Sequence, residues 1–198
     1  MASLSVNQLI SETRKAALGK GYSFGQADDI ARALEWLAGF GHVPSDEISR
    51  LLDAPQEEAP LRPQIEGATL MQKGTLGLVD VMAALDFYEA YEAKALSLSQ
   101  LCYPVISCGL IAKRAAPPLG QFVDAQGVML SKIYSTTPAS LDLHNAAFTP
   151  DSPRAWPARI VIEDDAYAML KRYAFETYVP SSDQSRAAGA GAGLNDND

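Results

Sequence analysis

Residues 5–39 have the sequence SVNQLISETRKAALGKGYSFGQADDIARALEWLAG, which predicts two consecutive amphipathic helices. Apolar residues recur at helical spacing in both halves of this stretch. Ser5 with Gln8, and Ser23 with Gln26, fit the capping box, in which the two side chains bond reciprocally to backbone amides at a helix start. A glycine follows each apolar run, as is usual at helix ends.

A third, shorter helix is predicted to begin with the segment PSDE at residues 44–47, with Ile48, Leu51 and Leu52 on its apolar face. Residues 1–52 are therefore expected to form a helical subdomain. The next stretch, residues 53–66, contains three prolines and four acidic residues, which indicates an exposed connector. Residues 67–180 are predicted to form an α+β core, and all of these parts to belong to a single domain.

The core is expected to mix helices and strands. A buried helix is predicted over residues 76–93, with a strand over 76–82 as the alternative. Three strands are predicted, around residues 103–112, 128–135 and 159–162. Residues 164–174 have an acidic start and a basic end, which favours a helix, and residues 175–179 are expected to be extended. Because strands follow helices without regular alternation, the predicted fold is α+β, with the helical subdomain packed on a small mixed or antiparallel sheet.

The charge balance makes two classes of partner improbable. The chain has 198 residues, with 16 Lys and Arg against 24 Asp and Glu, giving a net charge of −8. Without clustered cations, neither nucleic acid nor an anionic membrane surface is an expected partner. The uncharged residues 95–112 contain proline, glycine and serine, so no membrane span is predicted there. No targeting segment is apparent, and we expect a cytoplasmic protein with reduced cysteines.

Ser140, Asp142 and His144 alternate with leucines, so on a strand these three polar residues share one face. A catalytic triad is disfavoured, because same-face neighbours on one strand lie roughly 6.6 Å apart and hydrogen-bonded partners need roughly 2.6–3.2 Å. Asp142 and His144 are better placed to share a metal ion, although no third ligand is identifiable. The favoured interpretation is structural, a half-buried strand with a polar face.

The two cysteines, Cys102 and Cys108, lack the short spacing of a metal knuckle or a redox pair. Cys108 has apolar neighbours on both sides, which predicts a small core residue instead of a nucleophile. A catalytic thiol would need a base, and the chain has only two histidines, His42 and His144. His42 follows a helix end, where its predicted role is to cap the last carbonyl groups.

The closing segment, residues 181–198, is polar and then alternates glycine with alanine before an acidic end. Its glycines lack the spacing and the flanking strand and helix of a dinucleotide-binding loop. Together with the block from Lys15 to Gly41, the segment from Thr177 to Asp198 resembles a proteobacterial family of about 200-residue proteins known only as a domain of unknown function. The resemblance implies that a tail of the type GAGAGLxDND belongs to the shared fold, and it supplies no catalytic or ligand-binding residues.

We therefore predict that the tail docks back on the body and lines a pocket for a small, anionic ligand. Arg186 would anchor the charge, Tyr178 would form a wall, and the amides of residues 189–193 would donate hydrogen bonds. The candidate ligand-binding residues are Tyr178, Ser185, Arg186, Gly189, Gly191, Gly193 and Asp196. No cofactor is predicted.

Two alternatives stay open. A small-molecule enzyme would show a perturbed acid or base, such as His144 or Asp165, facing the ligand. A protein-interaction or accessory subunit would instead pair its tail or a strand edge with another chain, and a homo-oligomer is one such case.

Overall fold

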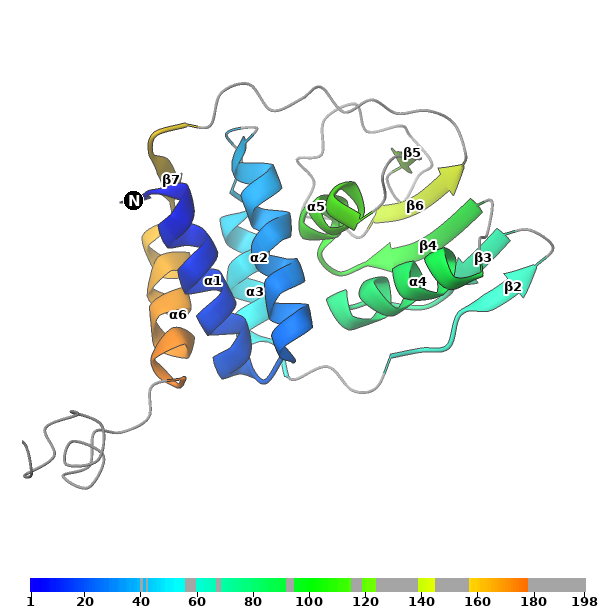
Figure 1. The fold of residues 1–198 in the computed structure, drawn as a ribbon, viewed down its shortest axis with the longest axis horizontal. Helices are drawn as coiled ribbons and strands as arrows, with labels where there is room; N and C mark the ends of the chain where they lie inside the picture. The colour runs from blue at the N-terminus through cyan, green and yellow to red at the C-terminus, as the bar shows by residue number, and fades with distance from the viewer. Residues whose placement is uncertain are drawn as a thin grey trace, which may run out of the picture.

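The computed structural model describes residues 1–39, 41, 43–55, 60–66, 69–91, 95–114, 119–123, 139–144 and 157–177. Of residues 119–123 and 139–144 it describes the backbone. The fold is α+β, as predicted, with a helical bundle at one end and a mixed sheet at the other (Figure 1).

Four helices form the bundle: α1 (Val6–Lys20), α2 (Phe24–Gly39), α3 (Ser45–Asp53) and α6 (Asp164–Phe175). Helix α1 packs between α2 and α6, and α3 packs on α6. Both predicted capping boxes are confirmed. The Ser5 hydroxyl accepts from the Gln8 amide at 3.2 Å, and the Gln8 side chain accepts from the Ser5 amide at 2.9 Å. A short antiparallel pair, β1 (Ala2–Leu4) and β7 (Ile160–Ile162), leads into α1 and α6.

A glycine allows α1 and α6 to approach closely. A methyl group on Gly19 would lie 1.9 Å from the carbonyl oxygen of Tyr173, well inside van der Waals contact. The last turn of α1 therefore lies directly against the last turn of α6.

The second sheet has the order β2-β3-β4-β6-β5. Its strands are β2 (Gln64–Glu66), β3 (Thr69–Gln72), β4 (Ala95–Leu101), β5 (Leu119–Val123) and β6 (Ala139–His144). Strands β3 and β4 are parallel and are joined by α4 (Leu78–Ala90), whereas the other neighbouring strands are antiparallel. The sheet is therefore mixed, and β2 and β5 are its edges.

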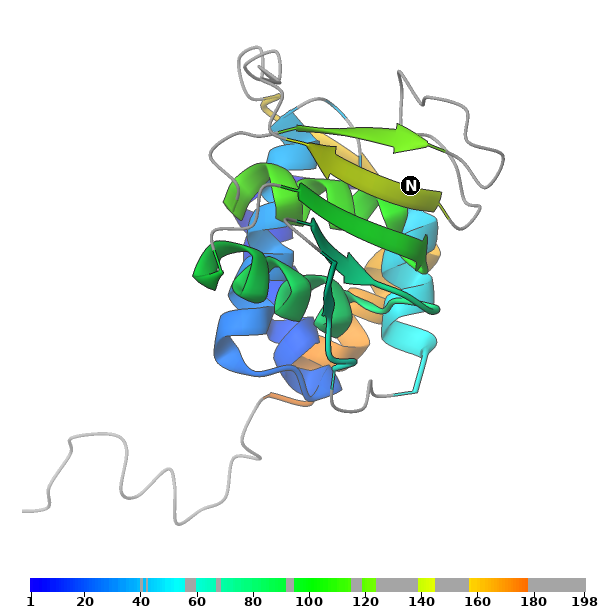
Figure 2. The same cartoon turned by 90° about the vertical axis from the view of Figure 1, so that its right-hand side faces the viewer.

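Helices α4 and α5 (Pro104–Arg114) lie between the sheet and the bundle (Figure 2). Helix α4 packs on β3 and β4, and α5 packs on α2. A methyl on Gly109 of α5 would lie 2.7 Å from the carbonyl oxygen of Ala33 of α2, so this contact is also close. The core runs continuously through the three layers. Within the described ranges, no helix combines the length and apolar character that a membrane span requires.

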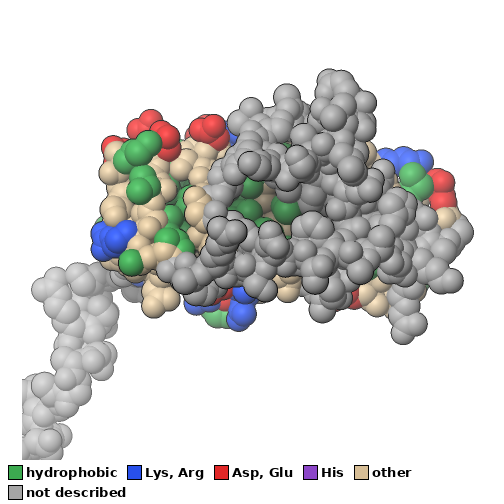
Figure 3. All heavy atoms as spheres, turned by 90° about the horizontal axis from the view of Figure 1, so that it is seen from above, with side chains coloured by type: hydrophobic (Ala, Val, Ile, Leu, Met, Phe, Trp, Pro, Cys, Tyr) green, Lys and Arg blue, Asp and Glu red, His purple; other side chains and the backbone are tan. Residues whose placement is uncertain are grey.

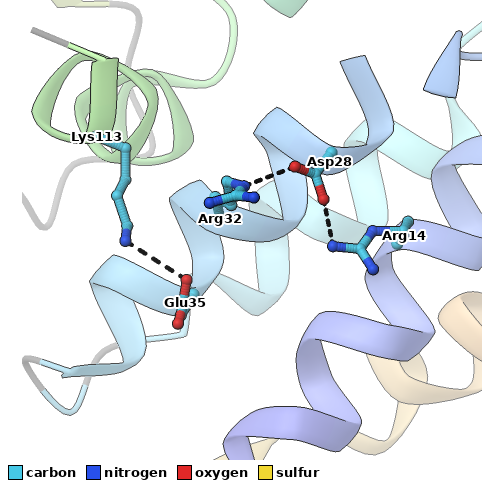
Figure 4. Close-up of polar contacts among 5 residues, drawn as sticks. All are labelled: Arg14, Asp28, Arg32, Glu35 and Lys113. Carbon is cyan, nitrogen blue, oxygen red and sulfur yellow. Dashed lines mark hydrogen bonds and ion pairs between the residues drawn. The ribbon is translucent and has the colours of Figure 1, made fainter. Parts of the chain in front are cut away.

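Ion pairs link α2 to the neighbouring helices α1 and α5 (Figure 4). Asp28 of α2 accepts hydrogen bonds from Arg32, at 2.6 Å, and from Arg14 of α1. These bonds, with that of Arg32 the larger, lower the pKa of Asp28. Glu35 pairs with Lys113 of α5 at 3.5 Å. The acidic positions of α2 therefore link it to α1 on one side and to α5 on the other.

Two sequence predictions are wrong in detail. The strand predicted around residues 103–112 is helix α5, and β4 lies before it. The residues of α5 are buried on all sides, so the sequence there shows no helical periodicity. The β-branched residues of this segment favoured a strand. Phe175 ends α6 and residues 176–177 form a turn, so the predicted extended segment does not begin there. The exposed strand β2 lies at the end of residues 53–66, the range predicted as a connector.

Other predictions are confirmed. The buried helix over residues 76–93 is α4, the strand near 159–162 is β7, and the helix over 164–174 is α6. The strand predicted over 128–135 lies outside the described residues. The proposed division into a helical subdomain, connector, core and tail stays a prediction.

Candidate functional site

A buried carboxylate joins α3 of the bundle to α5. The side chain of Glu47 is 3% exposed, and its two oxygens accept hydrogen bonds from the amides of Val105, at 3.1 Å, and Ile106, at 2.9 Å. These amides belong to the first turn of α5, where backbone N–H groups have no partner within the helix. Glu47 therefore caps α5 from another helix.

The surroundings of Glu47 perturb its ionisation. Burial raises the pKa of Glu47 to about 7, against the lowering effect of the two amides and of Arg50. The Arg50 guanidinium lies 3.9 Å from the carboxylate and donates to the Cys102 carbonyl at 3.0 Å. It also lies 5.6 Å from the centre of the Tyr103 ring. Two side chains of α3 therefore hold this region: Glu47 binds the first turn of α5, and Arg50 binds the segment before it.

Cys108 has the core role that the sequence predicted. It is buried, both cysteines are free, and burial, with the charge of Glu47, raises its pKa to about 12. A thiol with this pKa is almost fully protonated at neutral pH and is a poor nucleophile. A catalytic role for Cys108 is therefore unsupported.

We expect native protein treated with iodoacetamide near pH 8 to be alkylated at Cys102 at most. Cys108 should react only after unfolding, because its thiolate is both rare and inaccessible. Peptide mass spectrometry of native and unfolded samples measures this directly. Rapid alkylation of Cys108 in the native state would contradict the burial described above.

Two cations lie against one aromatic ring where α1 and α6 end. The Lys20 ammonium is 5.1 Å from the centre of the Tyr173 ring, and the Arg172 guanidinium is 5.3 Å from it. The close contact at Gly19 brings Lys20 to this ring. Within the described part of the chain, neither cation forms an ion pair with a carboxylate. Residues 178–198 continue the chain from this end of the bundle.

The polar strand predicted at residues 140–144 is β6. Its leucines at 141 and 143 pair with Leu98 and Leu96, which are fully buried toward the helices. Asp142 and His144 therefore occupy positions on the opposite face of the sheet, which no described helix covers (Figure 2).

Neighbouring strands add polar positions beside Asp142. It pairs in register with Ser97 of β4 and with Gln121 of β5, whereas His144 pairs with Ala95 and Leu119. Neither an amide nor a hydroxyl is a usual zinc ligand. Among the described side chains, no group of three histidine, cysteine or acidic residues is placed to hold a metal. A metal site at Asp142 and His144 stays a prediction.

The residues of the predicted tail site lie outside the described part of the chain; they are Tyr178, Ser185, Arg186, Gly189, Gly191, Gly193 and Asp196. His42 also lies outside it. On the face seen from above, small groups of acidic and basic side chains lie toward both ends of the molecule, and at the right-hand end they are close together (Figure 3).

Glu47 is the residue that sequence reasoning missed. In the sequence it is one of the residues of the PSDE segment at which the third helix is predicted to begin. The available signal was its position, because Glu47 lies beside Ile48 and four residues before Leu51 on the apolar face of the helix. A carboxylate on such a face has to find a buried partner.

Comparison with known proteins finds a family model that is similar to part of the chain. Residues 4–73 match the model of a family described as a protein of unknown function, DUF3726. The predicted resemblance to an uncharacterised family is therefore confirmed over this stretch, which includes Glu47 and the block from Lys15 to Gly41. Its proteobacterial origin and the shared tail stay predictions. Neither a curated protein nor a solved structure matches the chain.

Proposed function

We propose that the chain binds a small anionic ligand at the end of the bundle where α1 and α6 finish. The observation that carries the proposal is the pair of cations, Lys20 and Arg172, around the ring of Tyr173. On a chain of net charge −8, cations that lack carboxylate partners in the described part are available to an anion. An ammonium and a guanidinium are the usual recognition groups for carboxylate and phosphate.

The tail is proposed to complete this site. Tyr178 follows Phe175, the last residue of α6, by three positions in the sequence, so the tail begins at this helix end. Arg186 would add a third cation, Ser185 and the amides of Gly189, Gly191 and Gly193 would donate hydrogen bonds, and Asp196 would close the site. This arrangement uses the tail as the sequence predicted and supplies the body surface on which it docks.

The two cations also lie at helix C-termini, whose carbonyl groups carry partial negative charge. A purely electrostatic role for Lys20 and Arg172, offsetting the two helix dipoles, makes a different prediction from ligand binding. In that case their loss lowers the stability of the free protein and leaves any ligand effect unchanged.

The test is a thermal-shift titration with pyrophosphate and with citrate. At 100 times Kd, a ligand stabilises the native state by about 2.7 kcal/mol, which should raise the Tm by about 5 °C or more. We expect this shift in the wild type and its loss in the double variant Lys20→Gln/Arg172→Gln. Lys15→Gln, which removes a charge from the same helix, is the matched control and should keep the shift.

A second variant, Arg186→Gln, tests the tail separately. It should reduce the shift while leaving the Tm of the free protein unchanged. If the Lys20/Arg172 variant loses stability but keeps the full ligand shift, the cations serve only the helix ends and the proposal is wrong. Absence of a shift with both anions in the wild type would also contradict it.

A further inference from the structure

The edge strand β2 is exposed and borders an apolar surface. Gln64, Ile65 and Glu66 are all exposed, and β2 pairs on one side only with a described strand, β3. An open edge presents unpaired backbone N–H and C=O groups to another chain. Four large apolar side chains near this edge, which we call the edge patch, are also exposed: Leu61 (48%), Ile65 (55%), Phe87 (39%) and Tyr91 (59%).

A hydrogen bond shows which side of α4 faces the chain before β2. The Leu61 amide donates to the Asp80 carboxylate at 2.8 Å. At about 100° per residue, Phe87 and Tyr91 lie within about 20° of Asp80 around the helix. These two aromatic residues therefore lie on the strip of α4 that faces the segment leading into β2. Their rings are stacked, with centroids 5.8 Å apart.

The direction of α4 brings these aromatic residues beside β2. Helix α4 connects the parallel strands β3 and β4, so it runs opposite to both, and β2 is antiparallel to β3. Helix α4 and β2 therefore run the same way, as Figure 1 shows. From Asp80 to Phe87 the helix rises about 10 Å, and from Leu61 to Ile65 an extended chain rises about 13 Å. Because Asp80 and Leu61 are hydrogen-bonded, Phe87 and Ile65 lie at similar heights along this shared direction.

The register of β2 places Ile65 on the same face as α4. Ile65 pairs with Leu70, which is fully buried under the helices. Leu61 and Pro63 precede Ile65 at intervals of two, and Arg62, Gln64 and Glu66 alternate with them. The apolar residues of the edge patch therefore lie on the α4 side, and a polar row, Arg62, Gln64 and Glu66, lies on the other face.

We propose that the edge patch binds a second copy of this chain, through antiparallel pairing of β2 with the β2 of that copy. Such an interface has a twofold axis perpendicular to the sheet, so the pairing must be centred on a residue. When the pairing is centred on Gln64, Glu66 of one copy lies opposite Arg62 of the other. When it is centred on Ile65, the two residues are diagonal neighbours. The twofold axis produces this charge pair twice in either register. Opposite charges in these positions stabilise a pair of strands.

The same arrangement buries the apolar residues. Ile65 and Pro63 of the two copies meet on the α4 side, and the two stacked Phe87 and Tyr91 pairs approach each other above them. Centred on Glu66, the pairing would oppose two carboxylates, so charge disfavours that register. The edge thus carries a self-complementary pattern of charge on one face and apolar side chains on the other.

Sedimentation velocity over a range of concentrations tests the proposal. We expect a monomer–dimer equilibrium for the wild type that Ile65→Lys weakens by at least about tenfold, the effect expected at the centre of an interface. Val161→Lys is the matched control, because Val161 is a β-branched strand residue of nearly equal exposure, 56%, at the far sheet. It should leave self-association unchanged. Circular dichroism and Tm verify that both variants fold.

Charge reversal distinguishes strand pairing from a general apolar contact. Arg62→Glu and Glu66→Arg should each weaken self-association, because each places like charges across the dyad. An equimolar mixture of the two variants should recover a heterodimer, since every Arg then faces a Glu. Recovery on mixing also separates this effect from the Glu66–Lys73 pair, at 3.3 Å, within one chain. A wild type that is monomeric at all concentrations, a dimer that Ile65→Lys does not weaken, or a mixture that stays monomeric would overturn the proposal.

Discussion

Replacing Glu47 with alanine should lower the free energy of unfolding by about 3–5 kcal/mol, one of the largest effects of any single substitution in this chain. The change removes both acceptors of the Val105 and Ile106 amides, which are buried and donate to no other group in the described part of the chain. Each buried amide left unsatisfied costs about 1–3 kcal/mol. Chemical denaturation near pH 7 measures the loss, and Glu47→Gln, which keeps one acceptor and the shape, should cost less.

The pH profile of the same variants identifies the carboxyl group as the cause. The folded-state pKa of Glu47, about 7, is above its unfolded value of 4.5, so the folded protein binds the proton more tightly between these values. This contribution to stability is fully present below about pH 4.5 and is lost as the pH rises through about 7. At about 1.4 kcal/mol per pKa unit, it amounts to about 3 kcal/mol.

The difference in unfolding free energy between wild type and Glu47→Gln should therefore favour the wild type increasingly as the pH falls from about 7 to about 5. Wild type and Glu47→Gln must be compared at the same pH, because other carboxyl groups also change the stability of both proteins. Asp28, whose pKa is lowered, changes it in the opposite direction as the pH falls. A difference that does not vary with pH would show that Glu47 keeps an ordinary pKa. Equal stability of Glu47→Ala and wild type near pH 7 would contradict its capping role.

The parts of the fold that were predictable from sequence are those that local chemistry determines. The capping boxes at Ser5 and Ser23 start α1 and α2, and the charges of residues 163–172 orient α6 along its own dipole. Each of these signals lies within a single helix. Residues 104–114 carry no such signal, because α5 packs against both α2 and α4 and its buried residues occur on all sides. Only Pro104, a favoured first residue of a helix, pointed to the correct structure.

Features that depend on distant pairing were beyond sequence reasoning. The neighbours of β6 are β4 and β5, and the order of the five strands follows no local pattern. The amides that Glu47 caps are 58 and 59 residues away. The edge patch likewise combines Ile65 of β2 with Phe87 and Tyr91, which come from a different part of the chain and share with Ile65 only the α4 side of the sheet. Candidate sites built within one segment, such as Asp142 and His144, were visible in the sequence, and sites assembled from two or more elements were not.

Replacing Gly19 with alanine should lower the free energy of unfolding by a net amount of about 3 kcal/mol, although alanine is the better helix former. The helix propensity of alanine contributes about 1 kcal/mol in favour of the variant. Against it, the added methyl would lie 1.9 Å from the Tyr173 carbonyl oxygen, a backbone atom that cannot rotate away. Helices α1 and α6 would have to separate along their closest contact, and overpacking of this kind outweighs the propensity gain.

Gly25→Ala provides the matched control, because Gly25 is also helical and a methyl there meets no atom within 4 Å. That variant should be neutral or stabilised by up to about 1 kcal/mol. In a chain of this length the Gly19 variant should melt about 6–12 °C below the wild type. The separation of α1 from α6 would also move Lys20 away from the Tyr173 ring, so the same variant should bind pyrophosphate more weakly if the cation pair forms the proposed site. A Gly19→Ala variant as stable as Gly25→Ala would show that the two helices do not meet at this glycine.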